Sequence, residues 1–172
     1  MVPRFAAAAP WMVRDMAGKR ADLADKSKKA IVLIFVAHDC PISNAYAPEI
    51  NRICALYTAK QIAFYIVYPE AGFSPAQARR HAREYGYQCP LLPDAGHRIV
   101  KKTRVTVTPE VAVLAPQGKV LFRGRIDDRF AVLGKPRLQA THHDLRLALD
   151  AISAHKPIGT PRTTATGCDI EG

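Results

Sequence analysis

An uncharged apolar run near the start of the chain constrains the fold more than any other feature. Residues 30–37, AIVLIFVA, hold four β-branched residues in eight positions, which is typical of a strand buried on both faces of a sheet. A second run of this kind, IAFYIVYP at 62–69, follows a segment whose apolar residues recur with helical spacing. Buried strands alternating with helices predict an α/β fold.

The remaining segments complete a mixed central sheet with helices on both faces. The further predicted elements are a short strand and turn at 12–20, helices at 41–59, 74–87 and 141–156, and a hairpin formed by 108–116 and 120–127. The last helix is predicted to start with Thr141 and Asp144 as its capping pair. We expect residues 1–157 to form one domain and residues 158–172, rich in Pro, Gly and Thr, to be an extended, mobile tail.

Charge and composition restrict the classes of partner that the chain is expected to bind. The net charge is +10, but the basic residues are scattered, which predicts a solvated basic surface and no nucleic-acid site. No apolar run approaches the roughly 20 residues that a membrane helix needs. The stretch AAAAP at 6–10 resembles the end of an export signal without an adequate apolar segment before it. An exported setting is therefore slightly preferred over the cytoplasm.

Motifs around a single cysteine resemble the thioredoxin superfamily. The buried strand at 30–37 runs into DCPIS, where Cys40 occupies the first cysteine position of WCxxC and Ser43 the second. Pro48 matches the proline that kinks the active-site helix of that superfamily. Thr108 and Pro109, in VTP, resemble its cis-proline segment. The resemblance implies a thioredoxin-like α/β fold.

A narrower likeness covers nearly the whole chain. The motifs HDCPIS, LLPDAGHRIVKKTRVTVTPE, GKVLFRGRIDD, HHDLRLALDAI and TTATGCDI resemble peroxiredoxin-like redoxins of the AhpC/TSA type. These proteins share one cysteine at the first CxxC position and a C-terminal GCxI. The peroxidase pattern PxxxTxxC, however, would place proline and threonine where this chain has Leu33 and Ala37.

Cys40 is the predicted nucleophile. It lies where a strand ends and a helix begins, and the free N–H groups and dipole of a helix start favour a thiolate. We therefore predict an accessible sulfur with a lowered pKa; a buried, inert cysteine is the alternative. Asp39 would oppose the effect. His38 is either part of the site or a bystander at the end of the strand.

The second thiol of the site is left open by the sequence. Because Ser43 cannot form a disulfide, a mixed disulfide on Cys40 needs a thiol from elsewhere for its resolution. Cys54 and Cys89 are interpreted as core or lining residues. Cys168, in the tail, either resolves Cys40 or is a bystander.

The resemblance also implies a role for the Thr108–Pro109 turn. In the superfamily this turn faces the reactive cysteine, and the backbone at the position of Thr108 pairs with an incoming peptide strand. A substrate disulfide would thereby be held in line with Cys40.

These features predict a thiol oxidoreductase in which Cys40 attacks a disulfide or a peroxide, with Cys168 as the candidate thiol that would resolve the product. Its partners would be that substrate and an external thiol reductant, with no cofactor; the oligomeric state is not predicted. One alternative is a copper-binding protein using His38, Cys40 and Cys168, with His142 or His143 as a further ligand. The other is a non-catalytic binding module that kept the fold.

Overall fold

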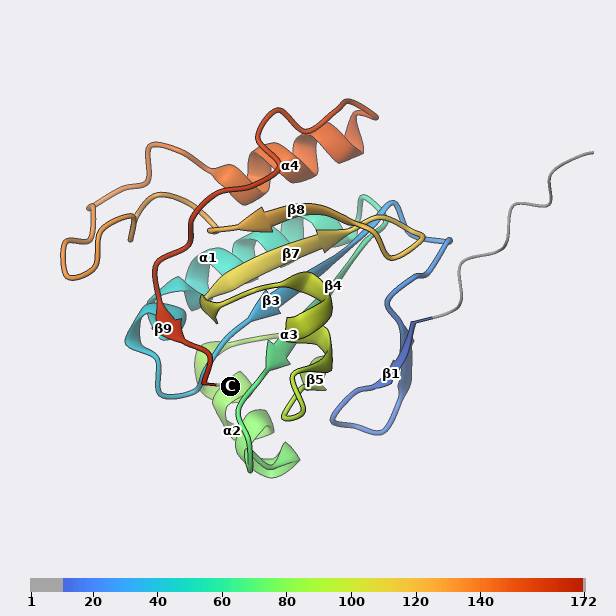
Figure 1. Cartoon of the computed structure of the whole chain (residues 1–172), viewed down its shortest axis with the longest axis vertical. Helices are drawn as coiled ribbons and strands as arrows, with labels where there is room; N and C mark the ends of the chain where they lie inside the picture. The colour runs from blue at the N-terminus through green and yellow to red at the C-terminus, as the bar shows by residue number, and fades with distance from the viewer. Residues whose placement is uncertain (1–10, 172) are drawn as a thin grey trace, which may run out of the picture.

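A five-stranded mixed sheet forms the centre of the molecule (Figure 1). The computed structural model describes residues 11–171, so the AAAAP stretch at 6–10 lies outside the described residues. The strands, in spatial order, are β5 (Leu91–Pro93), β4 (Ile62–Tyr68), β3 (Ala30–Phe35), β7 (Glu110–Leu114) and β8 (Val120–Gly124). The first three are parallel to one another, and β7 and β8 are antiparallel to their neighbours.

Helices cover both faces of the sheet, as the sequence predicted. The helices are α1 (Pro41–Thr58), α2 (Pro75–Tyr85), α3 (Arg98–Thr103) and α4 (Asp144–Ser153). Buried residues of α1, α2 and α4 pack with Val32 and Ile34 on one face of β3. Leu33 and Phe35 face the opposite side, where Ile99 of α3 completes a second core. Within the described part of the chain, no helix is both long enough and apolar enough to cross a membrane.

Local sequence accounts for the start of α2 but not for that of α4. Ser74 and Gln77 form the predicted capping box at the start of α2. The predicted Thr141–Asp144 cap of the last helix is wrong, because α4 starts later, with His143 as its N-cap. Thr141 instead donates its backbone N–H to the carboxylate of Asp128, 2.7 Å away, and is thereby held outside the helix.

Short elements were missed by the sequence analysis. β5 has three residues and α3 has six, too few to show a period. The N-terminal strand and turn are a hairpin of β1 (Met12–Arg14) and β2 (Arg20–Asp22), which packs beside the second core.

The C-terminal segment is extended, but the prediction that it is mobile is wrong. In Figure 1 it runs back from α4 across the end of the sheet to β9 (Cys168–Asp169). There β9 pairs antiparallel with β6 (Val107–Thr108). Further back, Thr163 and the carbonyl of Pro161 make backbone hydrogen bonds with Arg123 at 3.1 and 3.0 Å. A tail without an apolar core pattern is thus fixed through its backbone.

Candidate active site at the start of helix α1

Cys40 is the N-cap residue of α1, immediately after the loop that leaves β3. Its backbone is extended, and its side chain caps no N–H group of the helix. The predicted accessible sulfur is wrong for this state, because Cys40 is only 1% exposed. Its sulfur contacts Cys168 of the C-terminal segment and the carbonyl oxygen of Thr108.

Cys40 forms a disulfide with Cys168, which the sequence had left open. The two Cα atoms lie 6.1 Å apart although 128 positions separate them in the chain. This spacing is within the range that an unstretched backbone can bridge. The lowered pKa of Cys40 concerns the reduced thiol and stays a prediction.

The Thr108–Pro109 peptide bond is cis and adjoins the disulfide. The carbonyl oxygen of Thr108 lies 3.1 Å from Cys40 Sγ. Thr108 is also the strand partner of Cys168 in the β6–β9 pair. The backbone edge that the resemblance implies for a substrate strand is therefore occupied by the protein's own tail.

Glu110 stabilises the backbone that leads into β6. Its side chain is buried, and its carboxylate accepts the backbone N–H of Thr106 at 2.7 Å. Arg123 lies 3.6 Å from the same carboxylate and compensates its charge. Nothing in the sequence analysis identified Glu110, because the contact depends on the cis turn.

Gly167 makes the close contact of the tail possible. A Cβ atom at this position would lie 2.1 Å from the carbonyl oxygen of Thr108. Any side chain would push the tail away from β6. The glycine of the GCxI motif, which the sequence analysis quoted but did not explain, is thus required by backbone approach.

Ser43 is completely buried, and its hydroxyl has no hydrogen-bond partner. It is the N3 residue of α1, three positions after the N-cap residue Cys40. Pro41 has no N–H to donate. The N–H groups at the helix start and the Ser43 hydroxyl are therefore the donors closest in sequence to the Cys40 sulfur.

The His38 side chain is half exposed and interacts away from the disulfide. Its Nδ1 atom pairs with the carboxylate of Glu70, and its ring stacks on Phe73 with centroids 4.6 Å apart. The structure therefore assigns the ring to the Glu70–Phe73 surface and gives it no contact with Cys40 among the described residues.

A chain of polar side chains, partly exposed at Asn44 and buried at Tyr68, fixes the loop that carries His38 and Cys40. Asn44 donates its side-chain amide to the His38 carbonyl at 2.9 Å and accepts from His81 Nε2 at 2.9 Å. Tyr68 completes the chain through His81 Nδ1, 2.8 Å away. Desolvation lowers the pKa of His81, which favours the neutral ring that this arrangement needs. The sequence analysis missed Asn44 and His81.

The predicted copper-ligand set is not brought together. Cys40 and Cys168 are bonded to each other, and His38 is paired with Glu70. Of the histidines proposed as a further ligand, His143 lies among carboxylates instead. Over residues 11–171, the clusters of possible metal ligands contain no cysteine.

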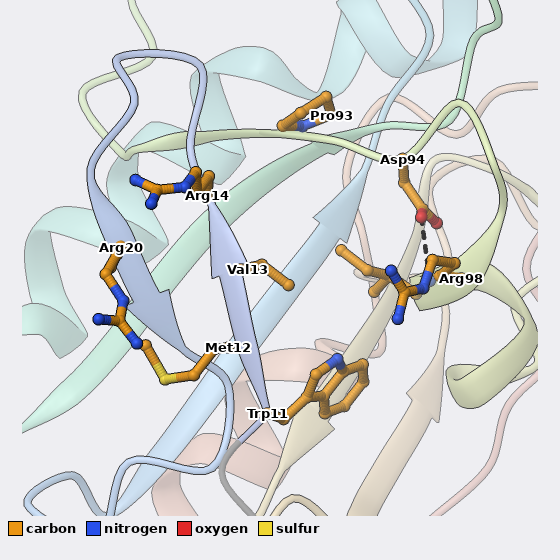
Figure 2. Close-up of a pocket in the computed structure, with 9 residues that line it drawn as sticks. Trp11, Met12, Val13, Arg14, Arg20, Pro93, Asp94 and Arg98 are labelled. Carbon is orange, nitrogen blue, oxygen red and sulfur yellow. Dashed lines mark hydrogen bonds between the residues drawn. The ribbon is translucent and has the colours of Figure 1, made fainter.

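A pocket of about 700 Å³, drawn in Figure 2, has neither Cys40 nor Cys168 in its lining. Its walls come from the β1–β2 hairpin, the end of β5 and the start of α3, and include Trp11, Arg14 and Arg98. The carboxylate of Asp94 faces inward, but the backbone N–H groups of Ile99 and Val100 satisfy it at 3.0 and 2.8 Å. No cysteine is among the residues that line this pocket.

Solved structures of similar fold include two of nearly the same extent. An uncharacterized conserved protein from Geobacillus kaustophilus matches with a TM-score of 0.82 and 24% identity, over 100% of this chain and 93% of the other. A hypothetical protein from Sinorhizobium meliloti 1021 matches with a TM-score of 0.80 and 23% identity, over 99% and 94%. These similarities show the fold alone.

A more distant match is a secreted Mycobacterium tuberculosis disulfide oxidoreductase homologous to E. coli DsbE, with a TM-score of 0.57 and 19% identity. It covers 84% of this chain and 94% of the other. No curated protein matches by sequence. The model of the AhpC/TSA family matches residues 1–123, about two thirds of the chain and the part that includes Cys40 and the cis turn. The chain therefore has a thioredoxin-like fold and belongs to the AhpC/TSA family.

Proposed function

We propose that this protein is a thiol–disulfide oxidoreductase in which Cys40 is the attacking thiol and Cys168 resolves the product. The observation that carries the proposal is the Cys40–Cys168 disulfide beside the Thr108 strand edge. The tail there has the position and strand pairing that a substrate peptide would need. Family membership and the fold both agree with thiol chemistry.

The reaction balances over two exchange steps. The Cys40 thiolate attacks one sulfur of a substrate disulfide, forms a mixed disulfide and releases the first substrate thiolate. The Cys168 thiolate then attacks the Cys40 sulfur, forms the observed disulfide and releases the second thiolate. The substrate gains two electrons and the protein loses two. An external thiol returns Cys40 and Cys168 to the reduced state.

The start of α1 supports the reduced form of the nucleophile. A thiolate on Cys40 would be positioned to accept hydrogen bonds from the N–H groups of Ile42 and Ser43, which a helix start leaves free. The buried Ser43 hydroxyl, which has no partner in the oxidised state, would be a third donor. These donors favour the ionised sulfur over the thiol.

A disulfide substrate is favoured over a peroxide. Peroxide attack would convert Cys40 to a sulfenic acid and release an alcohol or water, and Cys168 would then condense with it, losing water. The threonine of the peroxidase pattern would stand at Ala37, which has no hydroxyl, and the proline at Leu33, which is buried in β3. The chain thus lacks two residues of that pattern.

The second candidate is a non-catalytic module in which the same disulfide only secures the tail. The burial of Cys40, 1% exposed, favours this reading, because structural disulfides are typically protected from exchange. The two candidates differ in whether substrate reaches the reduced Cys40.

Single thiol variants separate these candidates. In a Cys54→Ala/Cys89→Ala background, which leaves only the two thiols of the site, the reduced protein is mixed with oxidised glutathione or with hydrogen peroxide. We expect fast exchange with glutathione, loss of this exchange in Cys40→Ser, and a trapped Cys40–glutathione adduct in Cys168→Ser, all measured by intact mass. Exchange no faster than that of an unstructured cysteine peptide would overturn the proposal, and so would an adduct that forms equally well in Cys40→Ser.

A further inference from the structure

A second pair of cysteines lies in contact outside the proposed site. Cys54, near the end of α1, and Cys89, just before β5, have sulfur atoms 3.1 Å apart and share a hydrogen bond. Cys54 is 7% exposed, and Cys89 is partly exposed. The sequence analysis correctly predicted a core position for Cys54 but not that the two thiols meet.

This pair is remote from Cys40. Cys54 follows Cys40 by fourteen positions on the same helix, which corresponds to about 21 Å along its axis. Cys89 precedes β5, and β5 is parallel to β3 and β4. The register pairs Leu91 with Ile66, two residues before the end of β4, so Cys89 lies level with the middle of the sheet, back from the end where β3 leads into Cys40. Exchange between the two cysteine pairs would require the core to open.

We propose that Cys54 and Cys89 form a second, independent dithiol–disulfide couple, oxidised by low-molecular-weight disulfides. The partly exposed Cys89 thiolate attacks one sulfur of the small disulfide and releases a thiolate. Cys54 loses its proton to solvent and attacks the Cys89 sulfur, which closes the protein disulfide and releases the second thiolate. The pair loses two electrons, and the small disulfide is reduced to two thiols.

The surroundings support this order of events. The hydrogen-bonded contact with Cys54 lowers the pKa of Cys89, whereas the same contact and burial raise the pKa of Cys54. Cys89 therefore ionises first and is also the one that solvent reaches. Closing the pair requires the sulfurs to approach by only about 1 Å, to the ~2.05 Å of a bond.

The ligand environment favours redox chemistry over a metal. Structural zinc needs four ligands, and this pair supplies two. Around these sulfurs, the described residues place no histidine or carboxylate that would complete a three-ligand cluster.

The experiment uses the full chain as a Cys40→Ala/Cys168→Ala variant, reduced and then treated with oxidised glutathione. Expected results are the loss of both thiols, no retained glutathione, and a Cys54–Cys89 cross-linked peptide after digestion. In the matched control with Cys54→Ala added, Cys89 should retain glutathione as a stable adduct. Closing the 35-residue separation should also raise Tm by roughly 5–15 °C, and the control should lack this shift.

Three results would contradict the proposed Cys54–Cys89 disulfide: both thiols stay free, glutathione stays bound to Cys89 while Cys54 remains reduced, or Cys89 is cross-linked to another residue. Wild-type protein gives a check that does not depend on variants, since complete oxidation should produce two disulfides with unmixed pairing. Because the test of the proposed function lacks Cys54 and Cys89, failure of either proposal leaves the other standing.

Discussion

Replacing Gly167 by alanine tests whether backbone approach of the tail controls the Cys40–Cys168 pair. The added Cβ would lie 2.1 Å from the Thr108 oxygen and 2.6 Å from its carbonyl carbon. Carbon–oxygen contacts settle at about 3.3 Å or more, so the tail must retreat by about 1.2 Å. If the adjacent Cys168 moves by the same amount, the Cα–Cα distance between Cys40 and Cys168 increases from 6.1 Å to about 7.3 Å. This distance exceeds the limit near 7 Å for an undistorted disulfide.

The energetic cost follows from that displacement. Forcing a methyl group into a filled contact costs about 1–3 kcal/mol, which corresponds to a roughly 5- to 150-fold weaker equilibrium for closing the disulfide. Gly159→Ala is the matched control, because Gly159 lies exposed in the same segment with no atom within 4 Å of its added Cβ. Both substitutions change the flexibility of the unfolded tail equally.

The assay equilibrates each protein in a series of glutathione redox buffers, blocks free thiols by alkylation, and quantifies Cys168 by peptide mapping. Wild type and Gly159→Ala should agree within about twofold, and Gly167→Ala should require a distinctly more oxidising buffer. If Gly167→Ala closes the disulfide as readily as Gly159→Ala, the tail does not depend on close approach to Thr108, and the reasoning is refuted.

Three further predictions concern single side chains. Cys168→Ser should lower the free energy of unfolding by about 5 kcal/mol relative to the oxidised protein, because a loop of 128 residues is no longer closed; coincident urea curves would contradict this. Ser43→Ala should raise the pKa of the reduced Cys40 thiol, read from the pH dependence of its alkylation rate, whereas an unchanged profile would show that the hydroxyl donates elsewhere. Burial alone would raise the pKa of Asp128, but hydrogen bonds from His142 and Thr141 outweigh it and hold that pKa well below its usual value. The resulting stability is present above the unfolded pKa near 3.9 and lost as pH falls below it, so acid unfolding should be shallower in Asp128→Asn, and identical slopes would exclude Asp128 as a cause.

In the proposed cycle, a peptide substrate would need the same strand edge that the tail covers in the oxidised state. The tail occupies the edge of Thr108, so a peptide substrate and β9 compete for the same backbone groups. Reduction removes the covalent link and leaves the tail held by two-residue pairing at β9 and by its contacts near Arg123. Release of β9 would then expose Cys40 without any change in the central sheet.

The sequence by itself determined the architecture and the position of Cys40, the proposed nucleophile. The apolar runs at 30–37 and 62–69 predict strands that are buried in a sheet covered on both faces. The strand-to-helix junction at Cys40 follows from the periodicity of the apolar residues alone. The capping box at Ser74 is likewise local, because its partners are three residues apart. Such features depend on neighbours in the chain.

Tertiary structure decided which thiols meet and why. The partner of Cys40 lies 128 positions away, and its approach depends on Gly167 fitting against Thr108, which no local pattern encodes. The Cys54–Cys89 contact likewise arises because the packing of α1 brings Cys54 to the segment just before β5. Local propensity fixes elements through the backbone of a few residues, whereas contacts between distant segments depend on how those elements pack.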